Sequence, residues 1–290
     1  MQTPFRTVGL VGKYDKPAMH DSVCKLGEFL RGRGHDVLLA SQTAERLNIH
    51  DCPHRNLHEL AAESDVVLVM GGDGTMLSIA RELASTGTPL IGINQGRLGF
   101  LTDITVDDMF DAVAEILSGQ YVAEERILLS GQVRRAGERV FQATAFNDVV
   151  VGKGASGRVI DLEIAINSEF VNSQRADGLI VTSPTGTTAY ALSAGGPIVH
   201  PTLEAVALVP ICPHTLSARP IVVSSHSRIE LTLTHAGDAR VHFDGQTHFD
   251  LASGDQVWIV RANRPITLLH PHSYSYYDTL RQKLHWGKRL

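Results

Sequence analysis

Apolar and polar residues follow two different patterns along this chain, and the change falls near residue 120. Before it, short apolar runs alternate with segments whose apolar residues recur every three or four positions. This predicts strands that alternate with helices, the pattern of a parallel sheet covered by helices. The expected strands are 7–11, 36–40, 66–70 and 88–94, and the clearest helices are 20–31 and 107–117.

After residue 120 the apolar residues alternate with polar ones over short segments separated by turn residues, which is typical of antiparallel strands. Asn167-Ser168-Glu169 and Asp244-Gly245-Gln246 have the composition of hairpin turns. We expect one loop-and-helix insertion near 183–200. The expected strands are 127–134, 140–145, 149–151, 159–166, 170–174, 179–182, 221–223, 228–233, 239–243, 256–260 and 266–269.

The predicted fold class is therefore α/β plus all-β. A Rossmann-like parallel α/β domain over residues 1–120 is followed by a β-sandwich-like domain over 121–270. A C-terminal tail over 271–290 has helical spacing from 274 to 286. We expect this tail to pack back on the body of the protein.

Composition and charge exclude several classes of partner. The 290 residues are 43% hydrophobic and 20% charged, as in ordinary globular proteins, and the net charge of −5 gives no reason to expect nucleic acid or an anionic membrane. No apolar run is long enough to span a bilayer, and the N-terminus does not have the pattern of a signal peptide. Cys24, Cys52 and Cys212 are odd in number and scattered, so we expect free thiols and a cytoplasmic protein.

The segment Gly71-Gly72-Asp73-Gly74-Thr75 follows an apolar strand pattern and precedes a helical one, so it lies on a strand-to-helix turn. Glycines there let backbone N–H groups approach a phosphate with no Cβ in the way. The Asp73 carboxylate would repel phosphate if the turn bound only anions. It is explained if Asp73 accepts a proton from an attacking hydroxyl or helps to hold a metal ion, so the turn predicts phosphoryl transfer. The alternative is that Asp73 caps the helix.

A second dense segment runs from Asp177 to Pro197. The predicted strand ends at Thr182, a hydroxyl-rich turn around Gly186 follows, and a short helix begins near Thr188. Hydroxyls and free N–H groups at a helix start suit phosphate or ribose oxygens. In the alternative interpretation, the hydroxyls only cap the helix.

With both segments considered together, the chain resembles the bacterial NAD kinase family over nearly its whole length. The resemblance rests on residues 71–75, 94–100, 146–151, 176–197 and 212–222. The first motif is shared with diacylglycerol-kinase-like and phosphofructokinase-like enzymes, whereas 176–197 is specific to the family. The resemblance implies transfer of the terminal phosphoryl of ATP, or of polyphosphate in some members, to the 2′-hydroxyl of the adenosine ribose of NAD, giving NADP.

The resemblance also implies the same two-domain architecture, a divalent metal that is usually Mg²⁺, and a homodimer or homotetramer. Two other functions remain open. A related lipid or sugar kinase would share the first motif, but no amphipathic membrane-binding segment supports the lipid version. A non-catalytic dinucleotide sensor would use the same scaffold, but would not need the carboxylate of Asp73 facing phosphate.

Residue by residue, the resemblance makes Asp73 the general base, with Gly72 and Gly74 bringing N–H groups to the phosphates. Asn147 and Asp148 match an Asn-Glu pair that holds adenine and ribose groups of NAD. Asp148 is one methylene shorter than the family's Glu. The alternative for both is a strand-start pair with no special role.

Asp177 falls where the family recognises the nicotinamide side of NAD. Arg175 and Arg158 lie at matching positions, where a guanidinium suits ribose or phosphate oxygens; each is otherwise a solvated strand charge. Phe100 is expected beside the adenine or in plain apolar packing, and Tyr190 in the nucleotide pocket or the core. The remaining predicted nucleotide-binding residues are Thr188, Ala189, Ala191, Leu192, Ser193 and Gln246.

Two further patterns are discounted. Residues 152–157 have the spacing G-x-G-x-x-G, but a strand pattern follows instead of a helix, so we interpret the segment as a hairpin loop. His50, Cys52, His54 and His58 have the spacing of soft-metal ligands. No second cluster completes them, and we predict no metal held by protein residues there.

Overall fold

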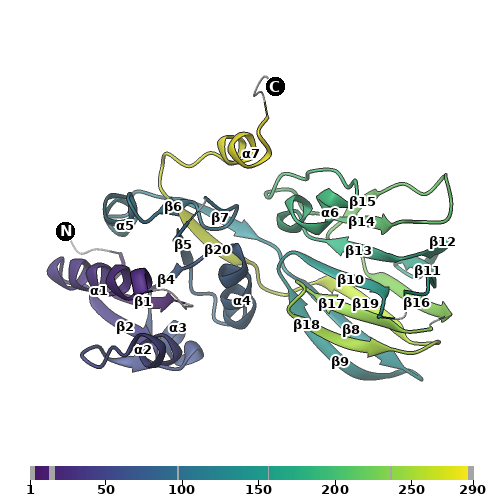
Figure 1. Cartoon of the computed structure of the whole chain (residues 1–290), viewed down its shortest axis with the longest axis horizontal. Coiled ribbons are helices and arrows are strands. Elements are labelled where there is room, and N and C mark those ends of the chain that lie inside the picture. Colours follow the sequence, from purple (N-terminus) through teal and green to yellow (C-terminus); the bar gives the residue numbers. More distant parts are fainter. Residues whose placement is uncertain (1–3, 13–16, 97, 156, 236, 287–290) are drawn as a thin grey trace. The chain divides into compact units, whose positions relative to one another are not determined.

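The computed structural model describes residues 4–12, 17–96, 98–155, 157–235 and 237–286. The chain divides into two compact units, Met1–Glu125 with Ile266–Leu290, and Arg126–Pro265. Figure 1 shows helices and strands alternating in the first unit and strands dominating the second. The predicted combination of a parallel α/β domain and a sandwich-like β domain is confirmed.

The first unit is built on one sheet with the strand order β3-β2-β1-β4-β5-β20-β7, and β6 pairs with β5. Every pairing recorded among β1 to β6 is parallel. Its strands are β1 Thr7–Gly12, β2 Asp36–Ala40, β3 His54–Arg55, β4 Val66–Met70, β5 Leu90–Asn94, β6 Ile104–Thr105, β7 Val122–Arg126 and β20 Ile266–His270. Its helices are α1 Pro17–Gly32, α2 Ser41–Leu47, α3 Leu57–Glu63, α4 Asp73–Leu83, α5 Met109–Leu117 and α7 Tyr276–Leu284.

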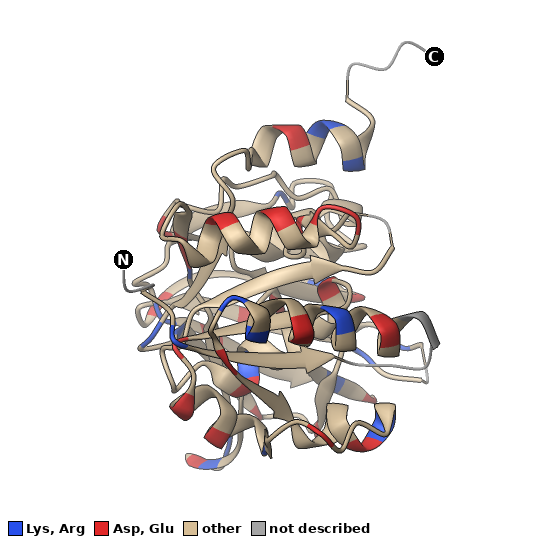
Figure 2. Ribbon diagram, turned by 90° about the vertical axis from the view of Figure 1, so that its left-hand side faces the viewer, with Lys and Arg blue, Asp and Glu red and all other residues tan. Residues whose placement is uncertain are grey.

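Helices cover both faces of this sheet. Val8 and Leu10 of β1 belong to the same buried apolar cluster as Leu26 of α1 and Val113 of α5. Gly9 points to the opposite face because successive strand residues alternate, and a Cβ there would overlap Leu60 of α3. Figure 2 looks onto this unit, with charged residues of both signs on its helices.

The second unit is a sandwich of two six-stranded sheets, with orders β15-β14-β13-β10-β17-β18 and β12-β11-β16-β19-β8-β9. Inward-facing residues of both sheets share one core, for example Val151 and Val181 from the first and Leu162 and Val257 from the second. The strands are β8 Leu129–Arg135, β9 Glu138–Ala145, β10 Asp148–Lys153, β11 Ile160–Ile166, β12 Glu169–Ala176, β13 Gly178–Thr182, β14 Ala205–Ile211, β15 Ile221–Ser224, β16 Ile229–His235, β17 Ala239–Phe243, β18 Thr247–Leu251 and β19 Gln256–Arg261. The short helices η1 Thr185–Thr188 and α6 Tyr190–Ser193 form the insertion.

Both predicted hairpin turns are present. Asn167 and Ser168 have positive φ values of 52° and 67° between β11 and β12, and Asp244 and Gly245 have 51° and 64° between β17 and β18. Positive φ at both central residues matches the twist of a tight hairpin.

Two expectations about connectivity were wrong. The strand predicted at 266–269 was placed in the β domain, but β20 pairs in parallel with β5 of the first unit. The segment 152–157 does not close a hairpin, because β10 and β11 lie in different sheets of the sandwich. In both cases the strand pattern is correct, but an apolar pattern does not specify which sheet a strand joins. Serine 156 lies outside the described residues.

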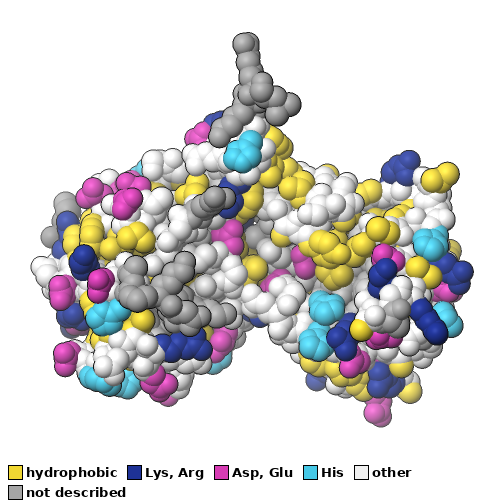
Figure 3. Space-filling view, viewed as in Figure 1, with side chains coloured by type: hydrophobic (Ala, Val, Ile, Leu, Met, Phe, Trp, Pro, Cys, Tyr) yellow, Lys and Arg dark blue, Asp and Glu magenta, His cyan; other side chains and the backbone are white. Residues whose placement is uncertain are grey.

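Helix α7 confirms the helical spacing of the tail. Its residues Tyr276 and Leu280 are buried, and the ammonium of Lys283 lies 5.8 Å from the centre of the Phe100 ring within the same unit. Within the described residues, no helix combines the length and the apolar character required to cross a membrane. Acidic and basic side chains are interspersed over the face in Figure 3, without an extended field of one sign.

Candidate functional site

The glycine-rich turn connects a fully buried strand to an exposed helix start. All five residues of β4 are buried, and the N–H of Gly71 donates to the carbonyl of Ile93 on β5 at 2.8 Å. Gly72 is the N-cap of α4, and Asp73 is its first residue. Gly72 and Gly74 are exposed and have no neighbouring heavy atom within 4 Å of a Cβ position. The turn therefore leaves backbone open to a ligand on both sides of Asp73.

The carboxylate of Asp73 is fixed by donors from the next loop. Its Oδ2 accepts the N–H of Phe100 at 2.9 Å, and its Oδ1 accepts the N–H of Leu101 at 3.0 Å and the hydroxyl of Thr102 at 3.2 Å. Asp73 is half-buried. A carboxylate has about four lone-pair positions, so these three bonds orient it and leave an acceptor position on Oδ2.

A buried side chain continues this arrangement. The amide of Asn94 donates to Thr102 Oγ1 at 2.8 Å, while its own Oδ1 accepts the N–H of Gly96 at 2.7 Å. Thr102 is fully buried and Asn94 nearly so. The chain of bonds from Asn94 through Thr102 to Asp73 thus ties the end of β5 to the glycine-rich turn.

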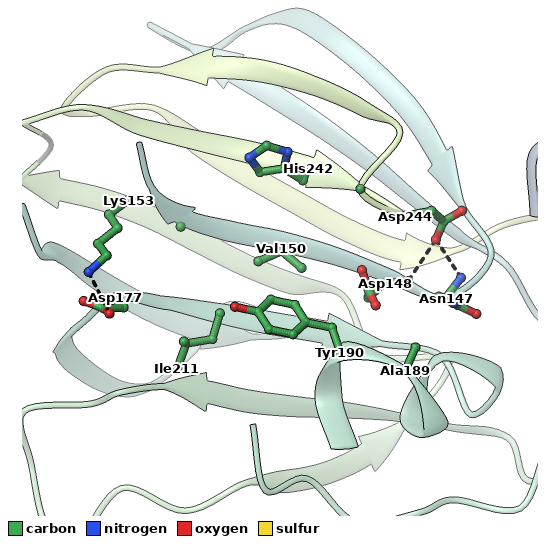
Figure 4. Close-up of a pocket in the computed structure, with 12 residues that line it drawn as sticks. Asn147, Asp148, Val150, Lys153, Asp177, Ala189, Tyr190, Ile211, His242 and Asp244 are labelled. Carbon is green, nitrogen blue, oxygen red and sulfur yellow. Dashed lines mark hydrogen bonds and ion pairs between the residues drawn. The ribbon is translucent and has the colours of Figure 1, made fainter. Parts of the chain in front are cut away.

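The second unit contains a cavity of about 540 Å³ that runs along β10, with further lining residues from β17, from the end of β14 and from the start of α6. Figure 4 shows the Tyr190 side chain reaching over it, with its hydroxyl directed away from Asn147. Five predicted residues line the cavity: Asn147, Asp148, Asp177, Ala189 and Tyr190.

Asp244 holds one wall of this cavity in place. Its carboxylate accepts backbone N–H groups from Phe146 at 2.9 Å, Asn147 at 2.7 Å and Asp148 at 3.1 Å. The β17–β18 hairpin therefore fixes the backbone that presents Asn147 and Asp148 (Figure 4). Asp244 also lines the cavity.

The same arrangement changes the acidity of Asp148. Its side chain is 5% exposed, and burial raises the pKa of its carboxyl to about 7, with a further contribution from the negative charge of Asp244. Asp148 therefore changes charge near neutral pH inside the cavity.

Asp177 is paired inside the cavity. Its carboxylate contacts the Lys153 ammonium at 2.8 Å, as Figure 4 shows. Lys153 belongs to the discounted glycine segment. The sequence did not predict the ion pair of Lys153, because Lys153 comes close to Asp177 only when β10 pairs with β13.

The hydroxyls of the 183–188 turn serve the fold. Ser183 Oγ donates to the carbonyl of Phe146 at 2.6 Å, and Thr187 Oγ1 to that of Pro184 at 2.6 Å; both residues are fully buried. Thr188 Oγ1 donates to the carbonyl of Thr185 at 3.3 Å. A Cβ on Gly186 would overlap the carbonyl of Asn147, so glycine is required for the turn to pack on the cavity wall. These hydroxyls fix the turn by donating to backbone carbonyls, and neither η1 nor α6 has a side-chain cap hydrogen bond.

Several predicted residues lie outside the cavity lining. Arg175 pairs with Asp161 on the neighbouring strand, at 2.8 and 3.0 Å, and its side chain is largely exposed. Arg158 and Gln246 are exposed, and Ala191 is packed in a small apolar cluster. Thr188 and Leu192 are half-buried and Ser193 is exposed. Phe100 contacts Asp73 through its backbone and Lys283 through its ring.

Lining residues that the sequence did not reveal include Val150, Ile211 and His242. Burial lowers the pKa of His242, with smaller contributions from His248 and Arg240. These residues are separated by up to about a hundred positions, and only strand pairing brings them together.

Family models match both halves of the chain. The ATP-NAD kinase N-terminal domain matches residues 8–121, and the ATP-NAD kinase C-terminal domain matches residues 146–270. A curated NAD kinase of Thiobacillus denitrificans is 82% identical over 290 residues, covering all of both chains. The chain belongs to the NAD kinase family. It is therefore an enzyme that phosphorylates NAD with ATP as the phosphoryl donor.

Other relatives agree with this NAD kinase assignment. An NAD kinase of Aromatoleum aromaticum is 50% identical over 288 residues, covering 99% of this chain and 96% of its own. The structure of yeast NADH kinase complexed with NADH has a TM-score of 0.90 at 24% identity, covering 100% of this chain and 90% of that one, and supports the fold. An Archaeoglobus fulgidus NAD kinase in complex with ATP has a TM-score of 0.76 at 27% identity, covering 96% and 98%. Neither a sensor nor a lipid or sugar kinase is favoured.

Proposed function

We propose that this NAD kinase transfers the terminal phosphoryl of ATP to the 2′-hydroxyl of the adenosine ribose of NAD, with Asp73 as the general base. The observation that carries this proposal is the position of Asp73, which begins α4 directly after a buried strand and is oriented by three donors from residues 100–102. A ribose hydroxyl is a weak nucleophile, and a positioned base contributes about 10²–10⁴-fold.

The Asp73 oxygens have different roles in this proposal. Oδ1 accepts two hydrogen bonds, whereas Oδ2 accepts the N–H of Phe100 among the described contacts. Oδ2 therefore has room to accept the hydroxyl hydrogen of the ribose. The loop donors restrict rotation of the carboxylate, so that its position is set before the substrate binds.

Gly72 and Gly74 contribute backbone N–H groups toward the transferring phosphates. The start of α4 supports this role, because the N-terminal end of a helix carries partial positive charge. Positioning and electrostatics then supply most of the acceleration, as is general for phosphoryl transfer.

The turn also fits a divalent cation, for which we propose Mg²⁺. Magnesium usually binds to one or two carboxylates together with substrate phosphates, rather than to an all-protein cage. Because the remaining acceptor position of Asp73 is assigned to the ribose hydroxyl, the phosphates of ATP would supply the ligands of the cation beside the exposed glycine backbone of the turn. The cation would neutralise charge on the phosphates of ATP.

On the NAD side, we assign Asn147 and Asp148 to the adenine and ribose groups, and Asp177 to the nicotinamide side. Their shared position on the lining of the 540 Å³ cavity supports this assignment. Ala189 and Tyr190 complete the proposed pocket. The roles of Phe100, Arg158, Arg175, Thr188, Ala191, Leu192, Ser193 and Gln246 rest on the family resemblance.

Use of polyphosphate, assembly and location are also part of the proposal. A homodimer or homotetramer is supported by exposed apolar residues on two edge strands, Ile221 and Val222 of β15, and Phe170 and Val171 of β12. A cytoplasmic location is supported by Cys24, Cys52 and Cys212, which form no disulfide in the described structure.

Product analysis tests the proposed reaction. Purified protein, ATP and Mg²⁺ are incubated with NAD or with an NAD analogue that lacks the 2′-hydroxyl of the adenosine ribose, and NADP is measured with an NADP-specific dehydrogenase. Phosphorylation of NAD and not of the analogue is expected. Transfer of phosphate to the analogue at a similar rate would show that another position accepts it. Replacing ATP by polyphosphate in the same assay determines the donor range.

A further inference from the structure

A cluster of buried polar side chains lies at the end of β20. His270, the last residue of β20, is 1% exposed, and its Nδ1 lies 2.9 Å from Oδ2 of Asp103. The other ring nitrogen, Nε2, lies 3.5 Å from Oε2 of Glu124 on β7. The side chains of Asp103 and Glu124 are only 7% and 10% exposed. The first unit therefore holds two acidic groups and a histidine largely away from water.

The ring of Tyr274 fixes the plane of this histidine. The two rings are stacked, with centroids 3.9 Å apart and an interplanar angle of 10°. The N–H of Tyr274 donates to the carbonyl of Pro271 at 3.0 Å, so a turn directly after β20 brings Tyr274 back over His270. A carboxylate only accepts hydrogen bonds, so Nδ1 is the donor to Asp103. The direction of this bond is set by a ring that is held on its face as well as at its edge.

Asp103 connects the cluster to the proposed base. It directly follows Leu101 and Thr102, whose N–H and hydroxyl donate to Asp73 Oδ1 at 3.0 and 3.2 Å. Hydrogen bonds weaken steeply when their geometry is distorted. A small displacement of Asp103 would therefore carry these donors away from the carboxylate that they orient.

The backbone gives this end of the loop little support of its own. The loop begins after β5 and ends at β6, which has only two residues and pairs with β5 through Ile104 and Thr105. Such a short strand contributes few ladder hydrogen bonds. Asn94 holds the loop through Thr102 near its beginning and end. The contact between Asp103 and His270 supplies a second side-chain anchor, just before β6.

Stability alone does not explain a buried cluster of acidic groups. Removing carboxylates from water is unfavourable, and apolar residues of similar size often replace buried ion pairs without loss of stability. A hydrogen bond differs from apolar packing because it restricts direction as well as distance. Buried polar networks whose groups are paired favour one arrangement over its alternatives. The cluster is explained if the exact position of the loop matters for the reaction.

We propose that His270 is a positioning residue for phosphoryl transfer. It holds Asp103, and through Asp103 it keeps the donors of residues 100–102 in place around the carboxylate of Asp73. His270 itself contacts neither NAD nor ATP in this role. The inference rests on the proposed function, since it explains how the proposed base keeps its orientation.

Two substitutions of Asp103 test the role of this contact. Asp103→Leu removes the acceptor for Nδ1 of His270, whereas Asp103→Asn keeps an oxygen that can accept from it. We expect kcat of Asp103→Leu to fall about tenfold, with the KM values for NAD and ATP within twofold of the wild type. Asp103→Asn should retain most of the activity. Asp107→Leu, the same change at an exposed position beyond β6, is the matched control and should have the wild-type kcat.

A second measurement separates positioning of the base from damage elsewhere. In an Asp73→Asn background the base is already absent, so Asp103→Leu should lower the remaining kcat less than twofold. An equal loss of kcat in both backgrounds would overturn the proposal, because the cluster would then act independently of Asp73. A raised KM with an unchanged kcat would also overturn it, since the cluster would then serve substrate binding.

The double variant that combines Asp103→Leu with His270→Phe guards against misfolding. It replaces both partners by apolar groups and keeps an aromatic ring beside Tyr274, a kind of change that can be nearly neutral for stability. We expect a melting temperature close to that of the wild type and a kcat reduced about tenfold. A folded double variant with the wild-type kcat would overturn the proposal. Absence of NADP formation by the wild type would instead contradict the proposed function.

Discussion

Gly99 lies against the carboxylate of Asp73, so closely that a Cβ at position 99 would overlap Asp73 Oδ1. The same Cβ would also overlap Thr102 Oγ1. Glycine at this position is therefore a requirement of the arrangement that orients the proposed base. The two glycine-rich loops of the first unit are parts of one site, since one carries the carboxylate and the other holds it.

Gly99→Ala should reduce catalysis without unfolding the protein. The added methyl would displace the Asp73 carboxylate from its donors, and a misplacement of about 1 Å can lower a rate 10²-fold. We expect kcat to fall about 10–100-fold, measured by NADP formation, with little change in the circular dichroism spectrum. Gly96→Ala is the matched control in the same loop, since the nearest atom to its Cβ would be 3.8 Å away. Equal activity of the two variants would contradict this role of Gly99.

Thr102→Val removes the hydroxyl of Thr102 and keeps the shape of the side chain, so it tests the hydroxyl alone. The change removes the donor to Asp73 and the acceptor for the buried amide of Asn94. An unsatisfied buried polar group costs about 1–3 kcal/mol, so we expect a lower melting temperature together with a kcat reduced about tenfold or more. Thr102→Ser keeps the hydroxyl and should retain most of the activity. If Val and Ser variants had the same kcat, the hydroxyl would have no role in orienting Asp73.

Some elements could be predicted residue for residue. β2, β4 and β17 match their predicted bounds, since each is a short, mostly apolar or alternating run between turn residues. β14 is absent from the predicted strands, and it contains Pro210, a residue that is unusual in a central strand. In the structure, Pro210 pairs with Leu179 of β13 and lies beyond the last residue of β14 that pairs with β15, so its missing N–H is tolerated.

The part of the candidate site whose residues are consecutive in the chain could be predicted from the sequence. The turn around Asp73 has its glycines and carboxylate in five consecutive residues. The contact of Asp244 with Phe146, Asn147 and Asp148 joins residues 96 to 98 positions apart. In the sequence, Asp244 is explained as an ordinary hairpin-turn residue, so nothing there indicates this contact. Contacts of this kind depend on strand pairing, which the sequence pattern does not specify.

Asp244→Ala should weaken NAD binding more than it slows the chemical step. The change frees three backbone N–H groups and releases the segment that presents Asn147 and Asp148. We expect the KM for NAD to rise about tenfold, with kcat within a few-fold of the wild type. Asp250→Ala, which breaks an exposed ion pair with Arg240, is the control and should have little effect. A wild-type KM for Asp244→Ala would rule out the positioning role.

The raised pKa of Asp148 makes a prediction about stability and pH. The folded pKa of about 7 lies above the unfolded value of about 3.9, so the folded state binds more protons between these values. The contribution of Asp148 is therefore most favourable below pH 4 and is lost as the pH rises through 7. Between pH 5 and pH 8 the loss is at most about 3 kcal/mol.

Asp148→Asn removes this titration. Thermal unfolding at pH 5 and pH 8 should show a smaller decrease in melting temperature for the Asn variant than for the wild type. The exposed variant Asp250→Asn provides a matched comparison and should follow the wild type. Parallel decreases in wild type and Asp148→Asn would show that another group is responsible.

The central claim is that Asp73 acts as the base. Asp73→Asn keeps the size of the side chain and removes the charge, so its effect on the chemical step can be separated from binding. Steady-state kinetics of NADP formation should show kcat reduced about 10²–10⁴-fold, with NAD affinity, measured by calorimetry, within a few-fold of the wild type. A folded Asp73→Asn protein that bound NAD and formed NADP at the wild-type rate would contradict the account.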